Sequence, residues 1–477
     1  MRRSIPIQDV EHQVQLKEFL DSQAAGRHEW LKKNHYYYDL LTRYLKLAIP
    51  ENSSVLEIGC GTGELLNALK PSYGVGIDIS GKMVDVARSQ FPHLHFIEAD
   101  AHNLPIEDKF DFVVISDTIG YLQDVQSVFS ELKKVVRSDT RVVITYFNYL
   151  WRWILVAGEK LGLKMKQPEQ SWLSLEDIAN LLHLAGFEVI RKYYKILFPL
   201  HVPVVSAFLN RVVANLPFFW KLSLTEIVVA RLAPDRPRDY SVTVVVPCRN
   251  EKGNIAGVIE RTPHMGSHTD IIFVEGHSTD ETLEEIKRQI AHHPQKDIQL
   301  VVQDGKGKGN AVRNGFAKAR GEVLIILDAD LSVAPEDLPK FYEALRQGKG
   351  EFINGCRLVY PMEIEAMRFL NTLGNKFFSR AFTYLLEQPF KDTLCGTKAV
   401  SKAGYGKIAA NRHYFGDFDP FGDFDLIFGA AKLNLKIVEL PVRYRERTYG
   451  ETNIRRFYHG WLLAKMCLFA LKKIKWI

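Results

Sequence analysis

Short apolar runs alternate with amphipathic, helix-like stretches along most of this chain, and they do so in two separate series. The first series begins at residues 54–58 and runs past residues 141–144, whereas the second begins at residues 242–246 and continues to the end. Alternation of apolar strands with helical patterns is typical of βαβ units around mostly parallel sheets. The pattern therefore predicts an α/β protein that contains two such sheets.

The segment between the two series has the composition of a linker. Residues 233–239 read Ala-Pro-Asp-Arg-Pro-Arg-Asp, with two prolines and four charged residues, which is typical of an exposed connection. A chain of 477 residues is also longer than one hydrophobic core normally supports. We therefore expect a first domain over residues 1–232, a linker over 233–239 and a second domain over 240–477.

Composition and charge exclude several classes of protein. The chain is 46% hydrophobic and 25% charged, as globular proteins are, and its net charge of +6 comes without the basic arm or aromatic signature of a nucleic-acid-binding protein. Five widely spaced cysteines indicate a reducing compartment and argue against a disulfide framework or a zinc site. Because there is no signal-peptide pattern and no apolar run near the ~20 residues that span a bilayer, we expect a cytoplasmic protein.

The strongest motif of the first series is Val-Leu-Glu-Ile-Gly-Cys-Gly-Thr-Gly-Glu at residues 55–64. An apolar strand runs into glycines and then into the helix-like residues 64–69. Glycine lets the backbone turn tightly against a ligand, and a helix start supplies unpaired N–H groups. Asp78 stands at the end of the next strand, where a carboxylate can accept both ribose hydroxyls of a nucleoside. Glu64 breaks the GxGxxG order of dinucleotide-binding enzymes.

Residues 30 to 232 resemble the class I methyltransferases, which have a Rossmann-like sheet. The resemblance implies that the domain binds S-adenosylmethionine. In that interpretation Glu57, Gly59, Gly61 and Gly63 shape the pocket for the methionine end, Asp78 binds the ribose, and Asp100 lies near the adenine. The alternatives are a glycine-rich turn in another α/β domain and a domain that has lost its activity.

The sequence does not identify the methyl acceptor. Asp117, Tyr121 and His183 are possible contacts, although each also has a structural interpretation. Residues 146–154 are unusually aromatic and follow an expected strand end. They form either a packed cap over the sheet or an acceptor site for an apolar or sugar-bearing molecule.

In the second series, polar residues stand where the expected strands end, the position at which open α/β sheets bind nucleotides. A glycine- and lysine-rich loop at residues 303–311 precedes a helix and suits a pyrophosphate. A buried strand at residues 323–327 carries two carboxylates at its end, and hard divalent cations favour such ligands. The candidate nucleotide-sugar ligands are Pro247, Asn250, Glu251, Glu275, Asp304, Lys308, Asp328 and Arg447, and the candidate metal ligands are Asp328 and Asp330.

Together these segments, over residues 240 to 460, resemble the family 2 glycosyltransferases of the GT-A fold, and especially the polyprenyl-phosphate and dolichol-phosphate sugar transferases. The resemblance implies inverting transfer from a UDP- or GDP-sugar, with Mg²⁺ or Mn²⁺ held near Asp328 and Asp330. It also implies an acidic base that faces the acceptor, for which Asp423 fits best and Asp425 second. The family often has two adjacent acids after its second strand, but here Gly276 follows Glu275, so the nucleotide stays open.

Residues 457–477 contain no acidic residue and carry lysines among aromatic and aliphatic side chains. This pattern suits either a helix on the cytoplasmic membrane surface or a terminal helix packed on its own domain. A membrane location would fit a lipid-phosphate acceptor.

The fusion predicts a bifunctional enzyme that transfers a methyl group and a sugar to a glycan, glycolipid or lipid-phosphate acceptor. One alternative is a working glycosyltransferase with a non-catalytic module that binds S-adenosylmethionine. Another is a non-catalytic protein of glycan assembly, against which the intact Asp328, Asp330 and glycine loop argue.

Overall fold

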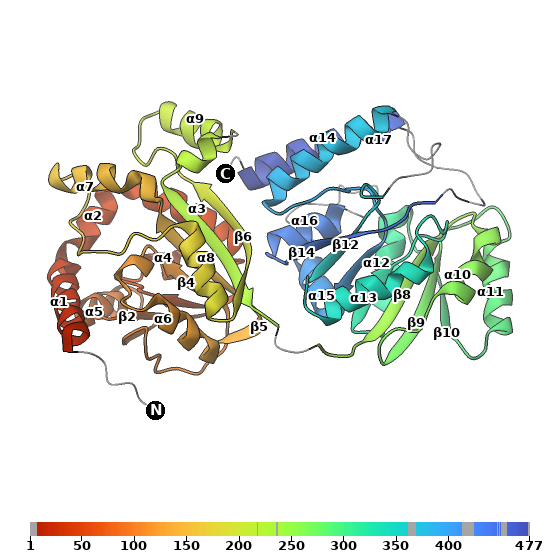
Figure 1. The fold of residues 1–477 in the computed structure, drawn as a ribbon, viewed down its shortest axis with the longest axis horizontal. Coiled ribbons are helices and arrows are strands. Elements are labelled where there is room, and N and C mark those ends of the chain that lie inside the picture. The colour runs from red at the N-terminus through yellow and green to blue at the C-terminus, as the bar shows by residue number, and fades with distance from the viewer. Residues whose placement is uncertain are drawn as a thin grey trace. The chain divides into compact units, whose positions relative to one another are not determined.

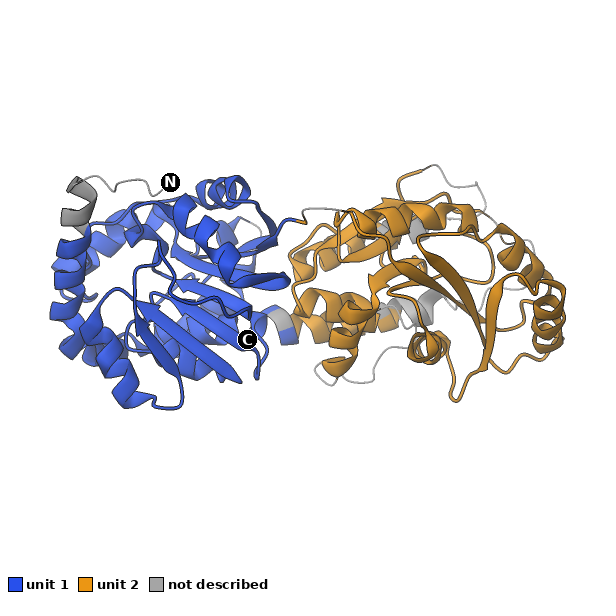
Figure 2. Ribbon diagram, turned by 90° about the horizontal axis from the view of Figure 1, so that it is seen from below, with its two compact units in different colours: residues 1–233, 473–477 blue, residues 234–472 orange. Residues whose placement is uncertain are grey.

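The computed structural model describes residues 7–216, 218–234, 237–360, 369–412, 424–445, 447, 449 and 456–475. The chain divides into two compact units (Figure 2). Unit 1 comprises residues 1–233 with 473–477, and unit 2 comprises residues 234–472. Each unit is built around its own seven-stranded sheet, which confirms the two α/β domains expected from the sequence.

The sheet of unit 1 has the strand order β3-β2-β1-β4-β5-β7-β6. The first five strands in this order pair in parallel, and β7 is antiparallel to both of its neighbours. The strands are β1 (Ser54–Ile58), β2 (Tyr73–Asp78), β3 (His95–Glu98), β4 (Phe110–Ser116), β5 (Val136–Phe147), β6 (Phe187–Lys195) and β7 (Thr225–Leu232).

The helices of unit 1 pack around this sheet (Figure 1). In α3, buried apolar residues recur three or four positions apart from Tyr37 to Ala48, as expected for a helix with one face in the core. A capping box formed by Ser174 and Asp177 begins α8. The helices are α1 (Ile7–Gln23), α2 (Arg27–Lys33), α3 (His35–Ala48), α4 (Glu64–Leu69), α5 (Gly81–Gln90), α6 (Val125–Glu131), α7 (Arg152–Lys160), α8 (Leu175–Leu184) and α9 (Val205–Arg211).

The sheet of unit 2 has the strand order β10-β9-β8-β11-β13-β12-β14. All neighbours are parallel except β13, which is antiparallel to β11 and β12. The strands are β8 (Ser241–Cys248), β9 (His268–Glu275), β10 (Asp297–Val302), β11 (Val323–Ile326), β12 (Phe352–Cys356), β13 (Lys398–Ser401) and β14 (Ile437–Pro441). The helices are α10 (Ile255–Arg261), α11 (Thr282–His292), α12 (Lys308–Lys318), α13 (Leu338–Arg346), α14 (Phe369–Leu386), α15 (Lys402–Ala410), α16 (Phe424–Lys432) and α17 (Arg456–Ala470).

This topology determines where the candidate site residues lie in each sheet. Parallel neighbours point their carboxyl ends to the same edge of a sheet, so the loops after β1, β2 and β4 meet in unit 1, and those after β8, β9 and β11 meet in unit 2. The central strands β1 and β11 are almost entirely buried.

None of the helices that the structure describes is long and apolar enough to cross a membrane.

Candidate functional site

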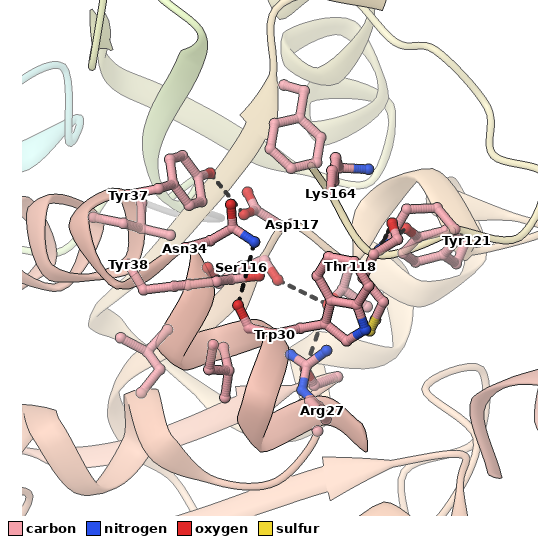
Figure 3. A pocket seen from close by; sticks show the side chains of 18 of the residues that line it. Arg27, Trp30, Asn34, Tyr37, Tyr38, Ser116, Asp117, Thr118, Tyr121 and Lys164 are labelled. Atoms are coloured by element: carbon pink, nitrogen blue, oxygen red, sulfur yellow. Dashed lines mark hydrogen bonds between the residues drawn. The ribbon is translucent and has the colours of Figure 1, made fainter. Parts of the chain in front are cut away.

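A cavity of about 1000 Å³ lies over the carboxyl ends of β1, β2 and β4 in unit 1 (Figure 3). Helices α1, α2 and α3 form one wall, and the segment after β5 contributes to another. Five of the six residues expected to hold the cofactor line this cavity: Glu57, Gly59, Gly61, Asp78 and Asp100. The sixth, Gly63, is the residue before α4 and shapes the turn.

The loop between β1 and α4 depends on its glycines. Gly59, Gly61 and Gly63 have φ values of +73°, +53° and +85°, a region that residues with a side chain rarely adopt. A Cβ atom on Gly59 would also lie 2.3 Å from the side chain of Thr118. The loop therefore brings bare backbone against the cavity, as a site for close approach of a ligand requires.

Asp78 holds this loop in place. Its carboxylate accepts one hydrogen bond from the backbone N–H of Gly61 at 2.8 Å and another from that of Ser80 at 2.9 Å. Burial raises the pKa of Asp78, although both backbone donors act in the opposite direction. Since a carboxylate offers about four lone-pair positions, Asp78 can hold the loop and still accept hydrogen bonds from a ligand.

Three charged side chains beside the loop have buried atoms without a hydrogen-bond partner among the described residues: Nε of Arg27, Oε2 of Glu57 and Oε1 of Glu64. Burial, and then the charge of Glu64, raise the pKa of Glu57 well above its ordinary value. The Arg27 guanidinium lies about 3 Å from the position that a Cβ on Gly61 would occupy. Buried polar atoms are usually paired, so unpaired atoms on a cavity wall mark a ligand position.

Sequence reasoning missed Arg27, which is the first residue of α2. Burial disfavours its charge, but Tyr38, Glu64 and Asp78 around it raise its pKa. Arg27 precedes the glycine motif in the sequence and is separated from it by α3. No local pattern distinguishes it from the other basic residues of α2.

Asp100 follows β3 and lines the cavity. It accepts hydrogen bonds from the backbone N–H of His102 at 3.0 Å and from Gln13 of α1 at 2.9 Å, and it contacts the His102 ring at 2.6 Å. Burial acts to raise the pKa of Asp100, but these bonds hold it below its ordinary value. Asp100 is therefore a fixed acceptor on the cavity wall.

A second group of polar residues is centred on Asp117, which also lines the cavity. Asp117 accepts hydrogen bonds from Tyr37 at 2.8 Å and Thr145 at 3.0 Å, and Figure 3 shows Tyr37 and Asp117 pointing toward one another. Burial raises the pKa of Asp117. Tyr121 also lines the cavity, whereas His183 is exposed on α8 and is not part of its lining.

The aromatic segment at residues 146–154 combines the two interpretations left open by its sequence. Tyr146 is buried in the core, whereas Trp151 and Ile154 line the cavity. Trp153 is 75% exposed. The segment is therefore part packing and part cavity wall.

In unit 2, the two carboxylates after β11 are each paired with a basic side chain. Asp328 Oδ1 lies 2.6 Å from Nζ of Lys308, the first residue of α12, and Asp330 Oδ2 lies 2.5 Å from Arg447. Burial opposes ionisation of Asp328, but Lys308 holds its pKa below the ordinary value. A Cβ on Gly396 would lie 2.0 Å from the Asp328 carboxylate, so this glycine leaves room for the pair.

Several of the expected nucleotide-sugar ligands stabilise the loops around this cluster. Asn250 accepts from the backbone N–H of Thr279 at 2.8 Å, and Glu275 accepts from those of His277 and Ser278 at 3.2 and 2.6 Å. Asp304 accepts from Asn310 and Asn314 of α12 at 3.0 and 2.8 Å. Pro247 lies within β8.

Glu251 faces the carboxylate cluster from the loop after β8. It accepts a hydrogen bond from Asn254 at 2.6 Å. Burial, with a smaller contribution from the negative charge of Asp330, raises its pKa to about 7. The charge of Glu251 thus depends on pH near neutrality.

The two candidate bases differ in what the structure describes. Asp425, in the first turn of α16, is paired with Arg412, whose Nε lies 2.6 Å from its carboxylate. Asp423 lies outside the described residues. No group of three or more His, Cys, Asp or Glu side chains that could hold a metal ion occurs among the residues the structure describes.

A buried ion pair near the cluster was not anticipated from the sequence. Arg357, at the end of β12, makes two 2.8 Å hydrogen bonds to Asp392, and its guanidinium lies 5.0 Å from the ring centroid of Tyr444. Lys398 of β13 is also buried and donates to the backbone carbonyl of Cys395. The pair of Arg357 with Asp392 belongs to no recognisable local motif, because its partners come from a strand end and from a loop 35 residues later.

Comparison with known proteins agrees with the division into two units. Residues 29–192 match the family described as "Methyltransferase domain", and residues 243–407 match "Glycosyl transferase family 2".

Among relatives of unit 2, glycosyltransferase AglJ of Haloferax volcanii is 29% identical over 229 residues, which are 48% of this chain and 71% of that protein. The dolichol-phosphate mannosyltransferase of Pyrococcus furiosus is 29% identical over 219 residues, which are 45% of this chain and 59% of that protein. For unit 1, the ubiquinone/menaquinone biosynthesis C-methyltransferase UbiE of Campylobacter jejuni is 34% identical over 116 residues, which are 22% of this chain and 49% of that protein. The chain thus spans only about half to two thirds of the length of several of its relatives, and it joins a methyltransferase domain to a domain of glycosyl transferase family 2.

Proposed function

We propose that this chain is a bifunctional transferase that uses S-adenosylmethionine in unit 1 and a UDP- or GDP-sugar in unit 2. The observation that carries the proposal is that each sheet ends, at the carboxyl edge of its central strand, in a cluster of partly or fully buried charged groups. Both clusters lie at the position where open α/β sheets bind nucleotides.

The residues of unit 1 fit S-adenosylmethionine, which would supply an electrophilic methyl group to the cavity. The unpaired Nε of Arg27 and Oε2 of Glu57 complement the carboxylate and ammonium of its methionine part. Asp78 retains free lone pairs for the ribose hydroxyls, and Asp100 is a fixed acceptor for the adenine end. This charge pattern matches both ends of the cofactor.

In the acceptor part of the cavity, Asp117 is the group best placed to take a proton. Tyr37 and Thr145 fix its orientation, and its raised pKa brings the carboxylate closer to the pKa of the hydroxyl or amine that loses the proton. An acceptor that is already nucleophilic needs no base, and then positioning by the cavity supplies most of the catalysis. Tyr121 and the Trp151 ring would orient the acceptor.

In unit 2, the pairs Lys308–Asp328 and Arg447–Asp330 support binding of a diphosphate together with Mg²⁺ or Mn²⁺. Two carboxylates fit a hard divalent cation, which needs further oxygens from the diphosphate and water. When those oxygens complete the ligands of the cation, Lys308 and Arg447 can bind the diphosphate instead of the carboxylates. The guanidinium of Arg447 can do so through bidentate hydrogen bonds. The cation would neutralise charge on the departing nucleoside diphosphate.

The proposed sugar transfer inverts the anomeric centre. The acceptor oxygen forms a bond to the anomeric carbon from one face, and the bond to the diphosphate oxygen breaks on the other with its electron pair leaving on the phosphate. Asp423 is the proposed base for a hydroxyl acceptor. Asp425 is the second choice, because its carboxylate already pairs with Arg412.

We also propose that unit 2 contacts the cytoplasmic membrane surface through α17. Leu462, Met466 and Ala470 are buried, and α17 packs against α14. The remaining face exposes Trp461, Leu468 and Phe469 beside Lys465 and Lys472. Exposed aromatic and basic residues on one helix face suit the interface of an anionic bilayer, and a polyprenyl-phosphate acceptor would be found there.

Asp423→Asn, assayed with a hydroxyl acceptor and with a polyprenyl phosphate, tests the sugar transfer. With a hydroxyl acceptor, loss of the base should lower kcat by at least about a hundredfold with little change in donor affinity. With a lipid phosphate, which is already ionised, the loss should be much smaller. A fully active variant on a hydroxyl acceptor would exclude Asp423 as the base, and Asp425→Asn would be tested next.

A second candidate function is a working glycosyltransferase whose methyltransferase unit binds the cofactor without catalysis. The observation that favours it is that the polar groups on the acceptor side, Asp117, Tyr37 and Thr145, already satisfy one another. Release of S-adenosylhomocysteine by the purified chain in the presence of an acceptor extract would distinguish the two.

A further inference from the structure

The methyltransferase unit carries its own exposed apolar surface, formed by two segments that line the cavity only in part. The first is residues 149–163, which include α7, and the second is residues 200–222, which include α9. Their most exposed apolar side chains are Trp153 (75%), Leu161 (73%), Val204 (83%) and Phe218 (71%). Soluble proteins rarely leave a contiguous apolar surface of this kind without a partner.

Hydrogen bonds join the two segments. The indole N–H of Trp151 donates to the carbonyl of Leu222 at 2.8 Å, and the Asn148 side chain donates to those of Lys221 and Ser223 at 2.9 Å each. In Figure 1, α7 and α9 lie along the same edge of unit 1. We call these segments together the apolar face.

The apolar face is continuous with the cavity. Ile154, Leu161, Leu163 and Leu200 line the cavity, yet each is at least half exposed. The mouth of the cavity is therefore bordered by the apolar face, and an occupant of this face would also cover the mouth.

The charge of the apolar face indicates which occupant it suits. Residues 200–222 contain no Asp or Glu, and residues 149–163 contain one acid, Glu159, whose side chain is 21% exposed and lies 2.7 Å from Lys164. The first segment also contains Arg152 and Lys160, and the second contains Arg211 and Lys221. Arg211 and Lys221 are exposed among the apolar side chains. Large apolar side chains mixed with more cations than anions are the composition that partitions into an anionic lipid surface.

The backbone adds a second observation. Val204 and Phe218, two of the most exposed apolar residues of the face, have φ values of +65° and +73°. A β-branched or bulky residue in this region is strained, and strain of this kind tends to persist at functional positions.

We infer that the apolar face docks on an anionic lipid bilayer and holds the mouth of the cavity against it. This inference is separate from the membrane contact proposed for α17, because it concerns other residues and another unit. The inference rests on the proposed methyl transfer only for the purpose of docking, which is to admit a methyl acceptor carried by lipid. Docking itself is measured without catalysis.

The test uses the full chain with an environment-sensitive fluorophore on one introduced cysteine, in a Cys467→Ser background because the other native cysteines are buried. Labels at Trp153→Cys and Phe208→Cys should shift to the blue and brighten with vesicles of equal parts phosphatidylglycerol and phosphatidylcholine, and doxyl-labelled lipid should quench them. Vesicles of phosphatidylcholine alone should give a weaker response. A label at Glu107→Cys, just before β4 at the opposite edge of the sheet from the cavity, should not respond.

Unlabelled variants give an independent measure. Phe208→Ser should weaken partitioning into the anionic vesicles on the order of tenfold, since it removes one lipid-buried aromatic side chain. Leu184→Ser, which removes an equally exposed apolar residue from α8 (both 56% exposed), should have no effect, and neither change should alter affinity for S-adenosylmethionine.

A response at a Trp461→Cys label with none at positions 153 and 208 would overturn the inference, because only α17 would then contact lipid. Chain dimerisation that protects positions 153 and 208 without vesicles would overturn it as well. Intact cofactor binding in either case would leave the proposed function standing. Loss of cofactor binding with normal vesicle docking would contradict the proposed function and leave this inference standing.

Discussion

Arg27→Met should separate a ligand-binding role of this arginine from a structural one. The Nε of Arg27 is buried without a hydrogen-bond partner among the described residues, so this atom adds no hydrogen bond to the free protein, where the guanidinium acts through the charges of Glu64 and Asp78. If the guanidinium binds the carboxylate of S-adenosylmethionine, the lost charged hydrogen bonds are worth about 1.5–3 kcal/mol. This corresponds to roughly 10- to 150-fold weaker binding.

The stability of the free protein provides the contrast. Methionine has a similar length and no unpaired donor, so the midpoint of thermal unfolding of unit 1 should fall by less than about 4 °C, which is about 1 kcal/mol for a domain of this size. Calorimetric titration and differential scanning calorimetry measure the two quantities. Arg27→Lys should bind with intermediate affinity because it keeps the charge but not the planar fork.

Arg43→Met, which removes an exposed arginine from α3, is the matched control and should change neither quantity. Unchanged affinity in Arg27→Met would refute the ligand role. A large fall in stability with only a small loss of affinity would show that Arg27 serves the fold instead.

Two further predictions concern charge. Asp330→Asn removes the partner of Arg447 and should abolish Mn²⁺-stimulated binding of the nucleotide sugar while the fold stays intact, so an unchanged Mn²⁺ response in equilibrium binding would exclude a metal at this position. Burial raises the pKa of Glu226 in β7 from 4.5 to about 8, and the native state therefore keeps a proton that the unfolded chain releases. Stability of unit 1 should fall as pH rises from 4.5 to 8, and Glu226→Gln should flatten that fall in thermal unfolding scans; an unaltered pH profile would contradict it.

The local part of both sites could be predicted from the sequence. The strand at residues 54–58, the helix at residues 64–69 and Asp78 at a strand end all lie where the structure has them. Each is encoded by neighbouring residues: an apolar run, glycines that permit positive φ, and a polar residue at the exposed strand end. The same holds for Asp328 and for Lys308 at the start of α12.

What the sequence did not predict depends on contacts between distant segments. Nothing near Arg27 marks it as a cavity residue, because only the packing of α2 against the glycine loop brings it there. The ion pair of Arg357 with Asp392 likewise joins a strand end to a loop 35 residues later. Lys308 and Asp328 were expected as separate ligands, and their pairing follows from the carboxyl edge that they share.

Calorimetric titration of the full-length chain tests the central claim, two independent nucleotide sites in one chain, most directly. S-adenosylmethionine should bind at one site per chain, and UDP or GDP with Mn²⁺ should bind at another. Asp78→Ala should lose only the first and Asp328→Asn only the second. Failure of either ligand to bind the wild-type chain, or loss of both ligands in one folded variant, would contradict the account.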